Sequence, residues 1–162
     1  MSSTSAVLTN PSVERVRHAL ERAGVQAGIV ELPGAARTAK AAAEFLGCEI
    51  GQIANSLVFR AASDTAVLVM SSGARRVDTE RLAALLGEPV GKADAEFVRR
   101  ETGFAIGGVA PVGHGLSRVF VEKALAAHPH LWAAAGHPHT VFRLVYSDLL
   151  RITGGKEAVL AA

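Results

Sequence analysis

Residues 102–115 read TGFAIGGVAPVGHG, and the rest of the chain is organised around this glycine-rich stretch. It holds five of the sixteen glycines of the sequence and one of the six prolines, Pro111. Glycine is needed where φ is positive or where a backbone must approach another group closely. A stretch this rich in glycine therefore predicts a sharply bent loop with an exposed backbone.

Two strand-forming residues, Phe104 and Ile106, lead into the pair Gly107-Gly108. This order predicts a strand that ends with main-chain N–H groups turned toward a pocket, where they could hold a carbonyl oxygen, a carboxylate or a phosphate. An ordinary glycine-rich turn between two strands is the alternative, and glycine content alone favours it. The stretch matches neither the phosphate-binding nor the dinucleotide-binding glycine motif.

The composition indicates one globular domain. The chain has 162 residues, of which 49% are apolar and 20% charged, as in ordinary folded proteins. No apolar run approaches the roughly 18 residues of a membrane span. The formal net charge of +2 is too small to identify a nucleic-acid binder by itself. The single cysteine, Cys48, excludes an internal disulfide and is typical of a reducing cytoplasm.

The ends of the chain differ in composition from its middle. Residues 1–10 are small and polar, without the basic and apolar regions of a signal peptide, so we expect a flexible N-terminal tail. Residues 11–156 carry the periodic patterns of a domain, and residues 157–162 are expected as a C-terminal tail. The sequence shows no internal repeat, linker or second domain.

Capping residues, apolar faces and closing glycines predict helices at 11–23, 39–46, 79–86, 95–100 and 148–152, with a short turn of helix at 50–54. Strands are predicted at 28–32, 55–61, 65–70, 89–90, 118–122 and 141–145, with 132–135 as a weaker candidate. The short connection at 62–64 makes an antiparallel hairpin of its two neighbours. Because helices interrupt the hairpins without a regular βαβ rhythm, we predict a single α+β domain with a mixed β-sheet flanked by helices.

Histidines offer a first candidate site. Two His-Pro-His triplets, at 128–130 and 137–139, would place both rings of each pair on one face of a strand, and His114 could join them around zinc. However, the sequence has no H-E-x-x-H motif, and the proline in each triplet favours a turn over a strand. We therefore expect no metal site and no cofactor.

A nucleophile is equally hard to find. The sequence has no G-x-S-x-G elbow. Cys48 lies next to Glu49, which would raise the pKa of the thiol rather than activate it. Ser56 follows Asn55 at an expected strand start, where a hydroxyl and an amide could face a ligand. Capping of the hairpin edge is the alternative for both residues.

Three segments are expected to meet at the ends of strands, where polar groups can converge on a pocket mouth: the glycine-rich stretch, Asn55-Ser56 and residues 136–139. Apart from histidine, they contain no strong general acid or base. A hydrolase built from them would depend on positioned backbone donors and on help from its substrate.

Taken together, several segments resemble the YbaK family, which is the family of the prolyl-tRNA synthetase-associated editing domain. The resemblance runs from about residue 11 to about residue 156 and rests on Thr38-Ala39, Ala42-Ala43, Leu46-Gly47, Gln52-Ile53, Ser56-Leu57-Val58-Phe59, Gly107-Gly108-Val109, Pro111, Gly113, Gly136, Pro138-His139, Asp148-Leu149 and Ile152-Thr153-Gly154-Gly155. It implies a free-standing α+β domain that hydrolyses the ester of mischarged aminoacyl-tRNA. The expected substrates are wrong amino acids, such as alanine or cysteine, on tRNA for proline.

The resemblance also implies a site. In the family the chemistry is metal-free, and the 2′-hydroxyl of the terminal adenosine assists the attack of water. Gly107 and Gly108 would position the substrate carbonyl, and Asn55 occupies the position of an expected catalytic residue. The residues expected to bind the substrate are Thr38, Ser56, Pro111, His114, Gly136, His137 and His139.

Asn55 departs from the family pattern, because many members place a lysine there. Asparagine can donate a hydrogen bond but supplies no charge. The chain therefore works without the lysine, handles a different acyl ester or has lost catalysis, and Arg37, Lys40 or Arg60 could replace the charge. A non-catalytic binding module for an aminoacyl-adenosine end or another small ligand is the alternative function.

The expected partner is the acceptor end of aminoacyl-tRNA in the cytoplasm, with no membrane, and a homodimer is one open arrangement. Contacts to phosphate should be few, because the net charge is small; they would come from Arg37, Lys40, Arg75, Arg76 and Lys92. A side chain at Gly108 is expected to block the substrate without changing the melting temperature.

Overall fold

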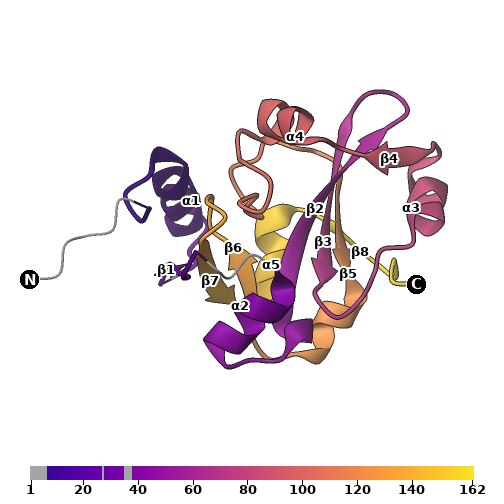
Figure 1. Ribbon diagram of the computed structural model, residues 1–162. Coiled ribbons are helices and arrows are strands. Elements are labelled where there is room, and N and C mark those ends of the chain that lie inside the picture. The colour runs from indigo at the N-terminus through magenta and orange to yellow at the C-terminus, as the bar shows by residue number, and fades with distance from the viewer. Residues whose placement is uncertain (1–6, 27, 35–37) are drawn as a thin grey trace, which may run out of the picture.

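In the computed structural model, residues 7–26, 28–34 and 38–162 are described. They form one mixed sheet of eight strands with five α-helices around it (Figure 1). The helices are α1 (Pro11–Arg22), α2 (Ala39–Leu46), α3 (Thr79–Leu86), α4 (Ala95–Thr102) and α5 (Tyr146–Thr153). The strands are β1 (Val30–Glu31), β2 (Ile53–Ala61), β3 (Ala66–Ser72), β4 (Val90–Lys92), β5 (Val119–Glu122), β6 (Leu131–Ala134), β7 (Thr140–Leu144) and β8 (Lys156–Ala158).

The sheet has the strand order β1-β7-β6-β2-β3-β5-β8. The remaining strand, β4, pairs with the same edge of β2 as β6 does, but farther along the strand. The β2–β6, β3–β5 and β5–β8 pairs are parallel and the others antiparallel. Two 3₁₀ turns, η1 (Ile50–Gln52) and η2 (Lys123–Ala127), lead out of α2 and β5. The predicted α+β class with a mixed sheet is confirmed.

Helix boundaries follow the caps that the sequence predicts. The Asn10 side chain accepts a hydrogen bond from Ser12 N–H at 2.8 Å, and Thr38 Oγ1 accepts one from Ala41 N–H at 3.0 Å. Gly47 ends α2 in the left-handed conformation, with φ of 68°. The expected helices at 39–46 and 79–86 therefore have the predicted bounds.

The β2–β3 hairpin is the centre of the sheet, and all seven residues of β3 are buried. Its predicted antiparallel pairing is confirmed by a register that runs from Ala54–Ser72 to Arg60–Ala66. The strand β2 starts at Ile53, two residues earlier than expected, because η1 ends at Gln52. Asn55 therefore lies inside the strand rather than at its start.

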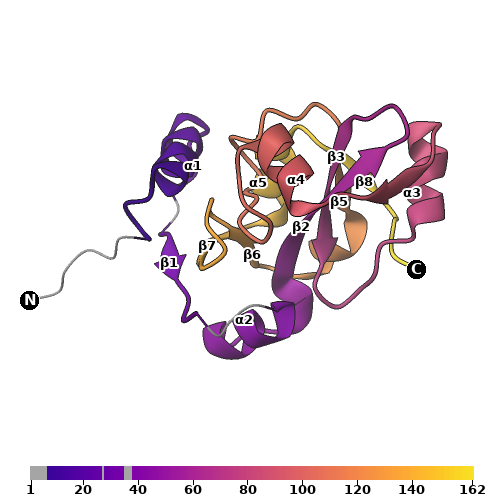
Figure 2. The same cartoon turned by 45° about the horizontal axis from the view of Figure 1, so that its top comes forward.

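Helices cover both faces of this sheet (Figures 1 and 2). One face packs under α1, α4 and α5, whose buried residues include Val16, Val98 and Leu149. The opposite face packs under α2 through Ala42 and Ala43, and under α3 through Leu82. Successive residues of β2 point alternately into these two layers, as the strand period requires.

The glycine-rich stretch contains no strand, and in this respect the sequence prediction is wrong. The chain leaves α4 through Gly103, with φ of 77°, and continues as an irregular loop to β5. Phe104 is only 1% exposed and packs under the guanidinium of Arg15, whose Cζ lies 4.3 Å from the ring centroid. Ile106 is 53% exposed. Burial of the aromatic ring, rather than strand pairing, therefore anchors this loop.

The C-terminal segment packs onto the domain instead of forming a tail. Its first residues belong to β8, and Leu160 is fully buried. The buried carboxylate of Glu122 accepts hydrogen bonds from the N–H groups of Leu160 at 2.7 Å and Ala161 at 3.3 Å. At the other end, residues 1–6 of the expected N-terminal tail lie outside the described residues. In the described part of the chain, no helix has the length and apolar character needed to cross a membrane.

Candidate functional site

The strand β2 has an open segment on one edge. This edge pairs with β6 through Ile53 and Ala54 and with β4 through residues 59–61. Between these two registers, residues 55–58 meet no partner strand on this edge in the described part of the chain, although their other edge pairs with β3. We call residues 55–58 the open edge of β2.

The alternation of strand hydrogen bonds decides which backbone groups are open. Gly73 N–H donates to the carbonyl of Ile53 at 2.8 Å, on the side of β3. Because the pattern repeats every two residues, odd-numbered residues of β2 turn their backbone groups toward β3 and even-numbered ones toward the opposite edge. The N–H and carbonyl of Ser56 and the N–H of Val58 therefore face the gap.

A cavity of about 330 Å³ lies against the open edge, and we call it the main cavity because it is the larger of the two beside this edge. Residues from α2, β2, β6, β7 and the glycine-rich loop enclose it. Its lining includes Leu32, Thr38, Ala39, Ala42, Ile53, Ala54, Asn55, Ser56, Leu57, Ile106, Gly107, Trp132, Ala133, Ala134, Pro138, Thr140 and Val141. The structure thus brings together four of the residues proposed from the sequence: Thr38, Asn55, Ser56 and Gly107.

A second cavity, the side cavity, lies on the α4 side of the same edge and has a volume of about 220 Å³. It shares Ser56, Leu57, Ile106 and Gly107 with the main cavity. The rest of its lining is almost wholly apolar and consists of Val58, Phe59, Lys92, Ala93, Val98 and Val109. The two cavities therefore meet where Ile106 and Gly107 face the open edge.

Most polar side chains of the main cavity are engaged in structural hydrogen bonds. Thr38 caps α2, Thr140 Oγ1 donates to the carbonyl of His137 at 2.9 Å, and the Ser56 hydroxyl lies 3.4 Å from the sulfur of Met70. The amide of Asn55, which is half-buried, has no hydrogen bond to any residue that the structure describes. Asn55 and the indole N–H of Trp132 are therefore the lining side-chain groups that no described residue bonds, and of the two only the Asn55 amide can both donate and accept.

Gly107 and Gly108 each require glycine, for different structural reasons. Gly107 has a φ of 86°, which favours glycine, and it is exposed in the cavity lining. Gly108 is buried, and a Cβ there would lie 2.9 Å from the Cα and C atoms of His137 and from the nitrogen of Pro138. The absent side chain of Gly108 thus permits close packing of the loop against the β6–β7 turn. This corrects the expectation that a side chain would leave stability unchanged.

The β6–β7 turn is held by hydrogen bonds between its own residues and forms one wall through Pro138. His137 N–H donates to Thr140 Oγ1 at 3.2 Å, and His139 N–H donates to His137 Nδ1 at 3.1 Å. Burial lowers the pKa of His137, and the adjacent His139 lowers it further. Gly136, with φ of 104°, packs against the backbone of α1, while His139 lines a separate surface depression. The histidines thus shape the turn and lie outside the described cavity lining.

Pro111 and His114 also lie outside the lining that the structure describes. His114 is 8% exposed, its Nδ1 accepts from Leu116 N–H at 2.9 Å, and its Nε2 lies 3.2 Å from the Pro111 carbonyl. Burial lowers the pKa of His114, and the hydrogen bond to Pro111 opposes this shift only partly. These contacts assign the neutral tautomer with the proton on Nε2, which ties the glycine-rich loop together.

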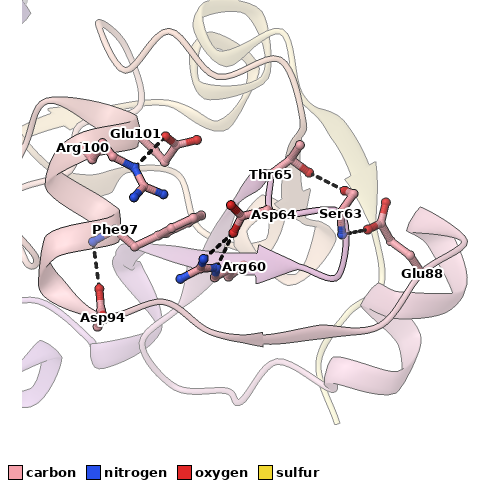
Figure 3. A network of polar contacts seen from close by, with 9 residues as sticks. All are labelled: Arg60, Ser63, Asp64, Thr65, Glu88, Asp94, Phe97, Arg100 and Glu101. Carbon is pink, nitrogen blue, oxygen red and sulfur yellow. Dashed lines mark hydrogen bonds and ion pairs between the residues drawn. The ribbon is translucent and has the colours of Figure 1, made fainter.

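Among the cations considered for the role of the missing lysine, Arg60 is engaged elsewhere. Figure 3 shows its guanidinium at the hairpin tip, where Nε donates to Asp64 at 2.6 Å and Cζ lies 4.7 Å from the Phe97 ring. Lys40 is exposed and is not part of the described lining, and Arg37 lies outside the described residues. Within the described lining of the two cavities, Lys92 of the side cavity is the single cation.

The remaining candidates do not build a reactive centre in the described part of the chain. Its histidine, cysteine and carboxylate side chains form no group of three or more able to hold a metal ion. Burial raises the pKa of the Cys48 thiol, and Glu49 adds to the shift, as the sequence predicts. The described lining of the main cavity holds no carboxylate, thiol or imidazole, and its chemistry rests on backbone groups, hydroxyls, one amide and the indole N–H of Trp132.

Several known proteins are similar to this chain. The uncharacterised protein YwhH of Bacillus subtilis (strain 168) is 26% identical over 129 residues, 79% of this chain and 82% of that protein. The proline–tRNA ligase of Thermosipho africanus is 37% identical over 90 residues, 55% of this chain; the match spans about a sixth of the ligase (16%). A crystal structure described provisionally as a trans-editing enzyme for prolyl tRNA synthetase is 42% identical, with a TM-score of 0.88 over 99% of both chains.

The family model for the aminoacyl-tRNA editing domain matches residues 34–152, which hold every described lining residue of both cavities except Leu32. The matched range includes the open edge of β2, the glycine-rich loop and the β6–β7 turn. The chain belongs to the aminoacyl-tRNA editing domain family.

Proposed function

We propose that the protein is a trans-editing deacylase that hydrolyses the ester between a wrong amino acid and tRNA, most directly tRNA for proline. The observation that carries this proposal is the main cavity against the open edge of β2, in a chain of the editing family. The relative described as a trans-editing enzyme for prolyl tRNA synthetase, and the matching part of a proline–tRNA ligase, support the choice of tRNA.

In this reaction, water adds to the ester carbonyl carbon and the bond from that carbon to the ribose oxygen breaks. The ribose oxygen takes up a proton, so the products are a free amino acid and a tRNA with a free terminal hydroxyl. The described lining of the main cavity offers no general base, so none of its hydroxyls is activated as a nucleophile. The attacking water therefore needs a base from the substrate, such as its neighbouring ribose hydroxyl. The protein would contribute orientation and backbone N–H donors to the developing oxyanion.

Gly107, exposed at positive φ between the two cavities, is our candidate for placing the ester carbonyl. The unbonded amide of Asn55 is our candidate for a side-chain contact with the aminoacyl or ribose end. Gly108, His137 and His114 would act as positioning residues, because they hold the loop and the turn against each other. Neither a metal nor another cofactor enters this scheme.

Binding of the tRNA body should be weak. Lys40, Arg75, Arg76 and Lys92 are exposed and none forms an ion pair with another described residue, so each could contact a phosphate. We expect two to four such contacts. A plot of the logarithm of the association constant against the logarithm of the salt concentration should then have a slope of about −0.7 per contact, the value for single strands. A tRNA partner also implies that the protein works in the cytoplasm.

The test is release of labelled amino acid from alanyl-, cysteinyl- and prolyl-tRNA for proline, with the same amino acids on their cognate tRNAs as controls. We expect rapid deacylation of at least one mischarged tRNA and little release from the correctly charged ones. A protein that binds the analogue 3′-deoxy-3′-(alanylamino)adenosine but hydrolyses none of the esters would instead be a binding module. The Asn55 amide, which no described residue bonds and which stands where many family members have a lysine, is the observation that favours this second function.

A further inference from the structure

The open edge of β2 offers Ser56 as one complete, unpaired backbone unit. Its N–H and carbonyl both face the gap between β6 and β4, and no described strand pairs with them. An unpaired strand edge is a template to which another extended backbone can add. Within residues 55–58, the two open groups of Ser56 belong to one residue, so an occupant that bonds both of them needs only one residue of extended backbone.

An aminoacyl ester matches this template, and the following inference rests on the proposed function. Its α-ammonium and its carbonyl flank one α-carbon, as the N–H and carbonyl of a strand residue do. In a hydrogen-bonded antiparallel pair, two facing residues exchange both bonds. We propose that the aminoacyl group adds to β2 as a single extended residue opposite Ser56. Its ammonium donates to the Ser56 carbonyl, and its ester carbonyl accepts from the Ser56 N–H.

This arrangement also decides where the amino-acid side chain goes. Side chains of directly opposed residues lie on the same face of a sheet. The Ser56 side chain lies on the same face of β2 as Ala54 and Val58. These two residues belong to the core cluster that contains Val98 of α4, so this face is the α4 side. An L-amino acid opposite Ser56 therefore sends its side chain into the apolar side cavity, beside Ile106 and Val109. The ester oxygen and the ribose are left in the main cavity.

The neighbouring groups of the edge agree with this choice. Asn55 and Leu57 are odd-numbered and turn their backbone groups toward β3, and the Val58 carbonyl lies at the end of the β4 ladder that begins at Phe59. Ser56 is therefore the residue of the open edge that offers both a donor and an acceptor between the two registers. Gly107 faces the same point from the loop and shares both cavities with Ser56. Acyl groups with an apolar side chain that fits the side cavity of about 220 Å³ are the substrate class that this geometry accepts.

Calorimetry with two non-hydrolysable analogues tests the proposal. They are 3′-deoxy-3′-(L-alanylamino)adenosine and its propionylamino counterpart, which lacks only the ammonium. A hydrogen bond from a charged group contributes about 1.5–3 kcal/mol, so the propionyl analogue should bind about 10- to 100-fold more weakly. The D-alanylamino analogue should also bind more weakly, because its side chain would point away from the side cavity.

Ser56→Pro tests the protein side of the contact. Proline is tolerated where the strand N–H points to an open edge, so the fold should survive, as circular dichroism can check. The loss of the Ser56 N–H, a neutral donor, should weaken both the alanyl and the propionyl analogue about 5-fold, while Ser56→Ala measures the hydroxyl separately. If Ser56→Pro does not fold, the comparison of the alanyl and propionyl analogues on the wild-type protein still tests the proposed binding mode.

Equal affinities of the alanyl and propionyl analogues would overturn this inference. If mischarged tRNA is still deacylated in that case, the proposed function stands and only the strand-like binding mode fails. If no mischarged tRNA is deacylated, the proposed function itself fails. Preferential binding of the L-alanyl analogue would then remain as evidence for a binding module that uses the same edge.

Discussion

Gly108→Ala is the substitution for which the structure predicts the most specific outcome. A Cβ at this position would lie 2.9 Å from three backbone atoms of the His137-Pro138 segment. Backbone atoms cannot rotate away as the end of a flexible side chain can, so the glycine-rich loop and the β6–β7 turn must separate. Both segments line the main cavity, through Gly107 and Pro138.

This separation should lower both the stability of the protein and the rate of deacylation. Inserting one carbon into a closely packed contact costs typically 1–3 kcal/mol. For a chain of this size, each kcal/mol lowers the melting temperature by about 2–4 °C, which gives a decrease of about 2–12 °C. The displaced loop also misplaces the carbonyl-binding point, and a shift of about 1 Å can cost about 10²-fold in rate. We therefore expect deacylation to fall by about that factor.

The assay pairs thermal unfolding with single-turnover deacylation of alanyl-tRNA for proline. Gly91→Ala is the matched control, because Gly91 has an ordinary φ and a Cβ there would contact no atom within 4 Å. We expect this control to keep the wild-type melting temperature and rate. A Gly108→Ala protein with unchanged stability and unchanged turnover would refute the reasoning, because it would show that the contact between loop and turn relaxes freely.

Asn55→Ala should lower deacylation about 5-fold, since a neutral hydrogen bond contributes about 1 kcal/mol; an unaltered rate on every substrate would remove Asn55 from the site. Burial holds the pKa of His114 below its ordinary value of 6.5, so the unfolded chain takes up a proton first as the pH falls. The free energy of unfolding should therefore decrease below pH 6.5 by urea denaturation, and His114→Gln should reduce that decrease. Glu122→Gln should lower the free energy of unfolding by about 2–3 kcal/mol, because it weakens two charged hydrogen bonds to the C-terminal segment. The same change at exposed Glu96 should leave stability within about 0.5 kcal/mol, and an equal loss at both positions would contradict this account of Glu122.

Much of the fold follows from local signals in the sequence. Asn10, Thr38, Asp78 and Asp94 each cap the helix that they predict, and their side chains accept the expected backbone hydrogen bonds. The hairpin around residues 62–64 is equally local. Each of these features depends on residues within a few positions of each other, so a single sequence is enough to predict them.

Features decided by distant contacts were not predicted. Phe104 and Ile106 have strand propensity, but burial of Phe104 beneath Arg15 decides their conformation instead. The strand β8 forms because β5 offers it a parallel edge, and this pairing joins residues more than thirty positions apart. The packing reason for Gly108 likewise depends on His137, which no local pattern could reveal.

The candidate site was predicted in part. Thr38, Asn55, Ser56 and Gly107 do meet in one cavity, whereas Pro111, His114, Gly136 and His139 stabilise the segments around it. The lining residue Thr140 was missed, although it follows directly after a predicted turn. The open edge itself depends on how two distant strands, β4 and β6, share one side of β2. Such a gap leaves no signal in the sequence of β2.

The most direct test of this account is to locate the aminoacyl end by NMR. The uniformly ¹⁵N-labelled protein is titrated with 3′-deoxy-3′-(L-alanylamino)adenosine, and the amide shifts are mapped onto the fold. We predict that the largest changes occur at Ser56, Val58 and Gly107, with none in α3, which lies away from both cavities. Changes centred on α3, with the amides of residues 55–58 unmoved at saturation, would contradict the claim that the open edge of β2 receives the substrate.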